Sequence, residues 1–245
     1  MQQDQIDISQ DTLDLLRRVS TATITTQLLK NHGMRTRAVA GVHPVNPATC
    51  KFVGPAFTAR YVPMREDLSM GGKRALALNP MQEAIDTMPS GSALVIDMMG
   101  NAGCGALGDI LIARLVARGT AGVVADGGMR DIEPVCQMSL PVFARGYAAP
   151  PSFTDLLAAD TQVPVGCGGV LVIPGDIVVA DADGVVVIPR YLADVVARDG
   201  FGQEQMEAWI RRKIDAGAAV RDYYPPKEQA LSEYRHWVAA GRPAT

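Results

Sequence analysis

The expected fold rests on residues Gly91–Glu133, which read GSALVIDMMGNAGCGALGDILIARLVARGTAGVVADGGMRDIE. Two short apolar runs, Ser92–Asp97 and Gly122–Ala125, are typical of buried strands. Between them lie a glycine-rich loop, Gly100–Gly108, and apolar residues at near-helical spacing that predict a helix over Ile110–Arg118. The order strand, helix, strand predicts two parallel strands joined by a right-handed crossover.

The loops that follow these two strands should meet at one edge of the sheet. Parallel neighbours end at the same edge and lie about 4.8 Å apart. The loop that carries Asp109 is therefore expected beside the loop Asp126–Asp131. Open α/β sheets bind their ligands at this edge. The sequence predicts a cleft there with one arginine, two or three carboxylates and the N-terminus of a helix.

The helix N-terminus in this cleft could hold an anion. The backbone N–H groups of Ile110 and Leu111 fall in the first turn, where they could bind a small carboxylate with the help of the helix dipole. Gly108 directly precedes the helix, and a glycine there lets a ligand approach the backbone closely. We expect these three residues to contribute to substrate binding.

The charged residues of the cleft each have a chemical use and a plainer alternative. Arg130 offers a planar cationic fork for a carboxylate or an enolate oxygen. Asp131 and Asp109 offer hard oxygen ligands suited to Mg²⁺ or Mn²⁺. In the alternative interpretation Asp109 only caps the helix, Asp126 starts a turn, and Arg130 and Asp131 form a surface pair. The convergence of these residues on one edge favours a functional cleft.

The same residues resemble a known family. Gly105-Ala106-Leu107-Gly108-Asp109 fits the pattern G-x-x-G-D, and Val124-Ala125-Asp126-Gly127-Gly128-Met129-Arg130-Asp131 fits V-x-D-G-x-x-R-D. Both patterns are similar to the class II aldolases that cleave 4-hydroxy-4-methyl-2-oxoglutarate, a family that includes the regulators of ribonuclease activity A. The 21-residue separation of Asp109 and Arg130 also matches. The resemblance continues through Val170–Pro189 and covers about residues 50–190.

The resemblance implies an α/β fold, namely an α/β/β sandwich like the phosphohistidine swivelling domain. It would form one domain over residues 1–245, with a core at about 20–190 and helical N- and C-terminal extensions, the latter at about 191–245. Members of this family assemble as homotrimers or homohexamers with sites between subunits, so we expect the same assembly here. Trp209 and Trp237, in the C-terminal extension, are expected to pack at an intersubunit surface.

The activity that the resemblance implies is cleavage of a carbon–carbon bond in a small 2-oxo acid, either a 4-hydroxy-2-oxo acid or oxaloacetate. Asp131 would hold Mg²⁺ or Mn²⁺, and Arg130 would stabilise a pyruvate enolate. Asp109 would orient a water molecule that carries protons. An acidic residue from a neighbouring subunit should complete the metal site, and Glu207 is preferred over Glu204. Either glutamate could instead be a solvated helix carboxylate.

Two other functions remain open from the sequence. The protein could be a non-catalytic regulator that binds a ribonuclease or another protein, as some relatives are. Cys104, in the glycine-rich loop, could be a nucleophile, but no histidine is nearby in sequence and a packing role fits better. The loop Arg65–Lys73 contains Gly-Gly-Lys without the spacing of a phosphate-binding loop, so an active-site flap or subunit contact is the better interpretation.

Composition excludes several classes of protein. A net charge of −3 in 245 residues gives no electrostatic footprint for nucleic acid. No segment approaches the roughly 18 uninterrupted apolar residues of a membrane span. The polar, acidic start is unlike a signal peptide. The four cysteines lack CxxC spacing and the three histidines are scattered, which argues against zinc and suits a reducing cytoplasm.

The rest of the chain alternates helical and strand patterns. Strands are predicted at Phe52–Pro63 and Leu140–Ala144, followed by a three-strand meander over Gly169–Pro189. Helices are predicted at Asp11–Arg18, Thr21–Lys30, Asn79–Met88, Leu192–Arg198, Gln203–Ala216 and Lys227–Ala240.

Overall fold

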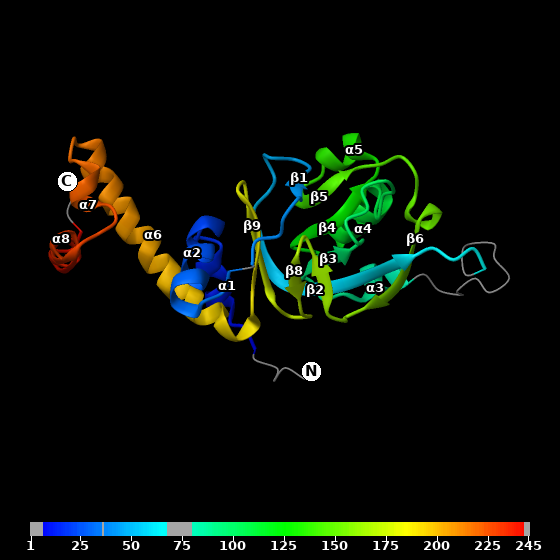
Figure 1. Cartoon of the computed structure of the whole chain (residues 1–245), viewed down its shortest axis with the longest axis horizontal. Coiled ribbons are helices and arrows are strands. Elements are labelled where there is room, and N and C mark those ends of the chain that lie inside the picture. Colours follow the sequence, from blue (N-terminus) through cyan, green and yellow to red (C-terminus); the bar gives the residue numbers. More distant parts are fainter. Residues whose placement is uncertain (1–6, 36, 68–79, 243–245) are drawn as a thin grey trace.

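A computed structural model of the chain describes residues 7–35, 37–67 and 80–242 (Figure 1). The strands are β1 (His43–Pro44), β2 (Phe52–Pro63), β3 (Ala93–Asp97), β4 (Gly122–Met129), β5 (Val142–Tyr147), β6 (Leu156–Thr161), β7 (Val165–Cys167), β8 (Val170–Val172), β9 (Ile177–Asp181) and β10 (Gly184–Ile188). The helices are α1 (Gln10–Leu16), α2 (Thr21–His32), α3 (Pro80–Thr87), α4 (Asp109–Ala117), α5 (Ile132–Cys136), α6 (Ala193–Asp215), α7 (Val220–Tyr223) and α8 (Glu228–Ala239). Two 3₁₀ turns, η1 (Ser152–Thr154) and η2 (Arg190–Leu192), complete the order.

The main sheet has the strand order β1-β5-β4-β3-β2-β9-β10, and β6 also pairs with β2. Strands β2, β3, β4 and β5 run parallel, with Ala93 opposite Gly122 and Asp97 opposite Asp126. The predicted strand–helix–strand unit is therefore confirmed. Strand β2 joins the parallel and the antiparallel parts of the sheet. Its first residues pair antiparallel with β9, and its middle pairs parallel with β3.

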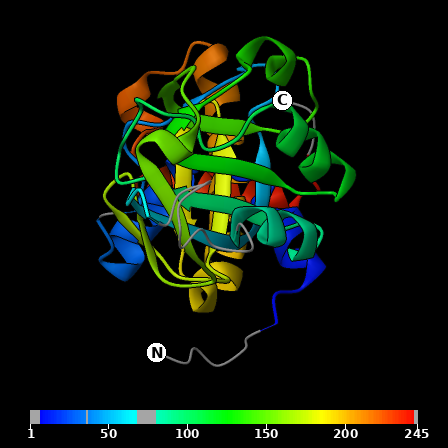
Figure 2. The same cartoon turned by 90° about the vertical axis from the view of Figure 1, so that its right-hand side faces the viewer.

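The parallel strands β2 to β5 are covered on both faces, and helices add a further layer beyond β9 and β10 (Figure 2). Helices α3, α4 and α5 lie over one face of the parallel strands, where Ile96, Ile112 and Leu115 are fully buried. The β7–β8 hairpin and the strands β9 and β10 cover the opposite face. Alternate residues of β9 and β10 point outward to α1, α2 and α6. The expected α/β/β sandwich with helical extensions is confirmed.

Strand β4 is longer than the sequence pattern suggests. We expected it to end at Ala125, but pairing with β5 resumes after an irregularity and continues through Gly128 and Met129. A side chain at Gly128 would put its Cβ 2.5 Å from the backbone oxygen of Cys104. The glycine-rich loop thus packs directly on this part of β4, and that contact keeps Asp126-Gly127-Gly128 extended instead of letting it form a turn.

The predicted meander over Gly169–Pro189 is wrong in its first strand. Strand β8 pairs with β7 in a separate two-stranded sheet, whereas β9 and β10 form the predicted hairpin. Gly168 and Gly169 both have positive φ angles, 52° and 79°, which turn the chain between β7 and β8. Strand β7 itself was not predicted.

Helix α6 is continuous where two helices were predicted. Residues 193–215 form one helix through Gly200 and Gly202, the positions at which we expected a break. Gly200 is buried, and a Cβ there would lie 2.8 Å from Cγ1 of Val19. The close approach between α6 and the α1–α2 turn offsets the poor helix propensity of glycine.

Trp209 packs within its own chain, contrary to our expectation of an intersubunit position. It is 1% exposed, and its ring lies 5.5 to 6.5 Å from those of Tyr223, Tyr234 and Trp237. Aromatic packing of this kind holds α6, α7 and α8 together. Trp237 is half-buried at the edge of the cluster.

Two of the predicted segments lie partly outside the described residues. The part of the Arg65–Lys73 loop beyond Asp67 lies outside the described residues, as does Asn79 of the predicted helix Asn79–Met88. Among the described residues, no helix is long and apolar enough to cross a membrane.

Candidate active site at the end of β4

The glycine-rich loop is fixed between two segments of the sheet edge. The Ala106 N–H donates to the Gly128 carbonyl oxygen at 2.9 Å, and the Arg130 N–H donates to the Leu107 carbonyl oxygen at 3.0 Å. On the other side, the Gly105 N–H donates to the Pro150 carbonyl oxygen at 2.9 Å. These bonds hold the loop beside the end of β4, so the N-terminus of α4 faces the residues that follow β4.

Two glycines make room for two charged side chains. A Cβ at Gly105 would lie 2.2 Å from Cγ of Arg130, and a Cβ at Gly108 would lie 2.2 Å from Oδ2 of Asp131. Real Cβ atoms do not approach other atoms so closely. The side chains of Arg130 and Asp131 therefore occupy space that exists because residues 105 and 108 have none.

Asp131 has an unusual backbone conformation. Its φ and ψ angles are 54° and 46°, in the left-handed region. Non-glycine residues in this region cluster at functional sites, where surrounding contacts hold them. The Asp131 side chain is directed at the start of α4, since the Asp109 N–H lies 3.4 Å from Oδ2 of Asp131. One carboxylate is thereby held, exposed, between the two loops.

Arg130 supplies a donor without an acceptor. The residue is half-buried, and its Nε is buried with no hydrogen-bond partner among the described residues. Buried guanidinium donors are normally paired, and leaving one unpaired costs free energy. Since Nε itself has almost no exposed surface, a ligand would meet this half-buried side chain through its terminal guanidinium nitrogens.

The start of α4 differs in one respect from the expected anion site. The Ile110 N–H donates to Oδ1 of Asp109 at 2.7 Å, so this group already has a partner. The Ile110 side chain is 78% exposed, whereas Leu111 is half-buried and packs on the core. A substrate carboxylate could use the Ile110 N–H only after the Asp109 carboxylate turns away.

A shallow groove of about 360 Å³ lies over the residues that end β4 and follow it, and the first residues of α4 are not part of its lining. Arg130 and Asp131 form its charged part, and its lining also includes Tyr147, the last residue of β5, and Ala148, which follows it. Strand pairing brings Tyr147 and Ala148 to the end of β4. Tyr147 is the register partner of Met129, and the Ala148 N–H donates to the Met129 carbonyl oxygen at 2.9 Å.

Asp126 does not belong to the site, so the lower of the two expected numbers of carboxylates, two, is found at this edge of the sheet. It lies within β4, is 6% exposed and pairs with Arg145. Its Oδ2 accepts the Gly168 N–H at 2.9 Å, which ties the β7–β8 hairpin to the sheet. The carboxylates of the site are therefore Asp109 and Asp131.

The two glutamates of α6 have different surroundings, and helix α6 itself lies on the other side of β9 from α4 (Figure 1). Glu204 accepts the Ser20 N–H at 3.0 Å and the Ser20 hydroxyl at 2.8 Å, at the start of α2. Burial alone would raise the pKa of Glu204, but these hydrogen bonds and one from Thr23 outweigh it and hold the pKa below its usual range. Glu204 is thus occupied in capping α2.

Glu207 lines a separate groove of about 700 Å³ between α2, α6 and the segment that precedes α8. It accepts a hydrogen bond from Nε2 of Gln203 at 2.8 Å, and Gln203 in turn accepts from Nε2 of Gln27 at 2.7 Å. No backbone group is capped by Glu207 in the described hydrogen bonds. Within a single chain, the structure does not bring Glu207 to Arg130 and Asp131.

The residues present suit some metals better than others. The described part of the chain contains no group of three or more His, Cys, Asp or Glu residues that could hold a metal ion. Structural or catalytic zinc needs three or four such ligands. Magnesium is commonly held by one or two carboxylates, with waters and substrate oxygens completing its shell. Asp131 and Asp109 fit this second pattern.

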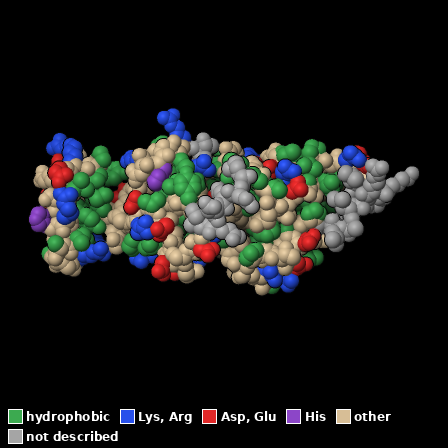
Figure 3. Space-filling view, turned by 90° about the horizontal axis from the view of Figure 1, so that it is seen from below, with side chains coloured by type: hydrophobic (Ala, Val, Ile, Leu, Met, Phe, Trp, Pro, Cys, Tyr) green, Lys and Arg blue, Asp and Glu red, His purple; other side chains and the backbone are tan. Residues whose placement is uncertain are grey.

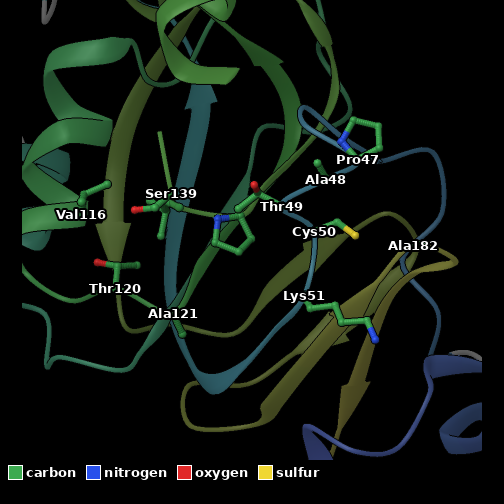
Figure 4. Close-up of a pocket in the computed structure, with 12 residues that line it drawn as sticks. Pro47, Ala48, Thr49, Cys50, Lys51, Val116, Thr120, Ala121, Ser139 and Ala182 are labelled. Carbon is green, nitrogen blue, oxygen red and sulfur yellow. The ribbon is translucent and has the colours of Figure 1, made fainter. Parts of the chain in front are cut away.

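Other candidate sites lack comparable groups. A groove of about 610 Å³ lies at the opposite end of the parallel strands, with Val116 and Thr120 on one side and Cys50 and Lys51 on the other (Figure 4). Lys51 is its one charged lining residue, so the groove has no acid–base pair. Cys104 is fully buried, and burial raises the pKa of its thiol. A raised pKa disfavours the thiolate and indicates a packing role.

Known proteins resemble this chain in sequence and in fold. The family described as RraA-like (Aldolase/RraA) matches residues 12–187. A protein of Halalkalibacterium halodurans named "Putative 4-hydroxy-4-methyl-2-oxoglutarate aldolase" is 32% identical over 189 residues, which cover 77% of this chain and 83% of that protein. Protein DlpA of Legionella pneumophila is 32% identical over 184 residues, or 75% of this chain, but this region spans 28% of DlpA.

A solved structure agrees with these sequence matches. RraAS2 of Streptomyces coelicolor, described as an unusual member of the RNase ES inhibitor RraA protein family, has a TM-score of 0.75 and 32% identity. The similarity covers 85% of this chain and 99% of that one. Similar proteins thus carry both aldolase and ribonuclease-inhibitor descriptions.

Proposed function

This chain belongs to the RraA-like (Aldolase/RraA) family, and we propose that it is a metal-dependent lyase that cleaves a carbon–carbon bond of a 2-oxo acid through a pyruvate enolate. The observation that carries the proposal is the presence of Arg130 and Asp131 side by side in the lining of one groove. Asp131 is an exposed carboxylate for which Gly108 leaves room. A cationic donor beside a hard-metal ligand suits a substrate that develops negative charge on oxygen.

The reaction of a 4-hydroxy-2-oxo acid at this site can be followed by its bonds. The C4 hydroxyl loses its proton, the C3–C4 bond breaks, and its electron pair becomes the enolate of pyruvate. The other half of the substrate leaves as an aldehyde or ketone, and C3 then takes up a proton. Oxaloacetate gives the same enolate when carbon dioxide leaves, so one site could perform both reactions.

The residues of this chain have separate roles in these steps. Arg130 binds the keto oxygen and stabilises it as it becomes the enolate oxygen, which is the largest contribution expected in such chemistry. Asp109 orients the water that takes the hydroxyl proton and returns one to C3. Asp131, with Asp109 nearby, would hold Mg²⁺ or Mn²⁺. Bound there, a divalent cation would supply Lewis-acid stabilisation of the substrate oxygens.

A second copy of the chain would complete the site. Of the two candidate glutamates of α6, Glu207 is the one that is not used as a cap, so it is the better candidate for donation to a neighbouring subunit. Figure 3 shows hydrophobic side chains on the surface near the end that carries α7 and α8, where Val220 and Tyr224 are more than half exposed. Such a surface suits subunit contact, and we propose a homotrimer or homohexamer.

Removal of metal tests this proposal. Pyruvate release from 4-hydroxy-2-oxo acids and oxaloacetate should stop in excess EDTA and return with Mg²⁺ or Mn²⁺, because the available ligands are oxygens. Asp131→Asn should behave like the chelated protein, since an amide is a poorer ligand for a hard cation. Full activity after long incubation with EDTA would refute the metal-dependent mechanism. Absence of pyruvate release from every substrate, with metal present, would favour a regulator that binds another protein.

The two α6 glutamates provide a matched pair of variants. Glu204→Ala should lower the free energy of unfolding by about 1 kcal/mol, allowing for its solvent exposure, and leave kcat intact. Because folding lowers the pKa of Glu204, this stabilisation is present above the usual glutamate range and is lost as the pH falls through the folded-state pKa. Glu207→Ala should lower activity without changing the melting temperature. The reverse pattern would assign the shared ligand to Glu204.

A further inference from the structure

The first half of the glycine-rich loop lies outside the groove, but it determines where Arg130 can lie. The aliphatic stem of Arg130 packs on Gly105, where a Cβ would lie 2.2 Å from Cγ of the arginine. Gly105 belongs to the segment Gly103–Gly105, which rests directly on β4, because a Cβ at Gly128 would lie 2.5 Å from the backbone oxygen of Cys104. A shift of this segment along β4 would therefore move the stem of Arg130 as well.

Asn101 holds this segment through both its backbone and its side chain. Its carbonyl oxygen accepts the Gly128 N–H at 3.2 Å, which joins the start of the loop to β4. Its Oδ1 accepts the Gly103 N–H at 2.7 Å, a side-chain bond to the backbone two residues on that turns the chain. Its Nδ2 lies 3.5 Å from Oδ2 of Asp155, the residue that ends η1. One half-buried asparagine thus connects the loop, β4 and the η1 segment.

Gly103 allows the asparagine side chain to approach this closely. A Cβ at position 103 would lie 3.1 Å from Oδ1 of Asn101 and 3.8 Å from Oδ2 of Asp155. At the other end of the segment, the Gly105 N–H donates to the Pro150 carbonyl oxygen at 2.9 Å. The part of the loop that supports Arg130 is therefore held at its start by Asn101 and at its end by Pro150.

We propose that Asn101 is a positioning residue of the lyase: its side chain fixes Gly103–Gly105 on β4 and thereby sets the position of the Arg130 guanidinium. This inference rests on the lyase function proposed above. Asn101 is not part of the groove lining, so it acts through Arg130 and not on the substrate. A cationic donor stabilises an enolate oxygen only where that oxygen develops its charge, and a displacement of about 1 Å can cost about 10²-fold in rate.

Asn101→Ala removes the side-chain acceptor and should lower kcat for exchange of the C3 protons of pyruvate in D₂O by about 10-fold, since the loop would shift by less than the full 1 Å. The Mg²⁺ concentration for half-maximal rate should not change, because Asp131 lies at the other end of the loop, beside Gly108. The matched control is Asn46→Ala. Oδ1 of Asn46 accepts the Ala48 N–H at 3.0 Å, with the same two-residue spacing, in the segment between β1 and β2. Its loss should leave kcat at the wild-type value.

An exchange of the two side chains tests whether the contact itself matters. Asn101→Asp keeps an oxygen that can accept the Gly103 N–H, but it places a second negative charge beside Asp155. The double variant Asn101→Asp/Asp155→Asn restores one amide and one carboxylate with their positions exchanged, and it should recover most of the kcat that Asn101→Ala loses. Amide hydrogen exchange at Gly105, measured without substrate, should be faster in Asn101→Ala than in the wild type and should slow again in the double variant.

The outcomes separate this inference from the proposed function. A wild-type kcat in Asn101→Ala, or a double variant as slow as Asn101→Ala, would overturn the inference. Equal losses of kcat in Asn101→Ala and Asn46→Ala would also overturn it, because they would indicate a general loss of structure. If the wild-type protein exchanges no pyruvate protons with Mg²⁺ present, the lyase function itself has failed, whereas amide exchange at Gly105 would still show whether Asn101 holds the loop.

Discussion

Replacement of Arg130 by alanine should lower kcat for pyruvate release from oxaloacetate by about 10²–10³-fold, which is the usual effect of removing one preorganised donor from a developing oxyanion. Arg130 lines the groove beside Asp131, where its guanidinium would meet the enolate oxygen through its terminal nitrogens. Arg130→Lys keeps the positive charge but loses the planar fork, and it should retain part of the activity. We expect the order wild type, lysine variant, alanine variant.

The melting temperature provides the control for these variants. Arg130 follows the last residue of β4 and lies outside the core clusters. Its removal loses the packing of its aliphatic stem on Gly105, but it also removes an unpaired buried donor, and these effects oppose each other. Nearly equal melting temperatures with graded kcat values would support the enolate role. Equal rates in all three proteins would exclude it.

Gly108→Ala should have the second-largest effect, on activity more than on stability. The new Cβ would meet Oδ2 of Asp131 at 2.2 Å, while the next nearest side chain, Arg130, is 3.9 Å away at Cβ. The carboxylate can rotate away, so the fold survives. A displacement of about 1 Å in a catalytic group can cost about 10²-fold in rate. The variant should need more Mg²⁺ for half-maximal activity than the wild type does.

Gly105→Ala is the comparison for this prediction. Its Cβ would meet Cγ of Arg130 at 2.2 Å and also the backbone nitrogen of Arg130 at 3.1 Å. The backbone cannot move as a side-chain end does, so this variant should melt at a lower temperature in addition to losing activity. A Gly108→Ala protein with wild-type metal dependence would show that the position of the Asp131 carboxylate is unimportant.

Local patterns in the sequence predicted the elements that hold the site. The apolar run before Asp97, the helical spacing after Asp109 and the apolar run at Gly122–Ala125 are short-range signals, and each became the expected element. The parallel pairing follows from their order. The sequence could therefore predict that the loop of Gly108 lies beside that of Asp131. The distance of 2.2 Å between a Cβ at residue 108 and Oδ2 of Asp131 could be found only from the structure.

Long-range contacts decided what the sequence could not show. Asp126-Gly127-Gly128 has the composition of a turn, but contact with the glycine-rich loop keeps it in β4. Asp126 is paired by Arg145, 19 residues away, and Glu204 by Ser20, 184 residues away. The position of Tyr147 beside Met129 depends on the register between β4 and β5. None of these long-range contacts leaves a periodic signal in the sequence.

Exchange of the methyl protons of pyruvate tests enolate formation without any choice of second substrate. Pyruvate in D₂O should lose its methyl proton signal in the presence of the Mg²⁺-loaded wild-type protein, because each enolate formed takes up deuterium at C3. The exchange should stop in EDTA and fall about 10²–10³-fold in Arg130→Ala. A methyl signal that decays no faster with the wild-type protein than in buffer alone would contradict the proposal that this site forms a pyruvate enolate.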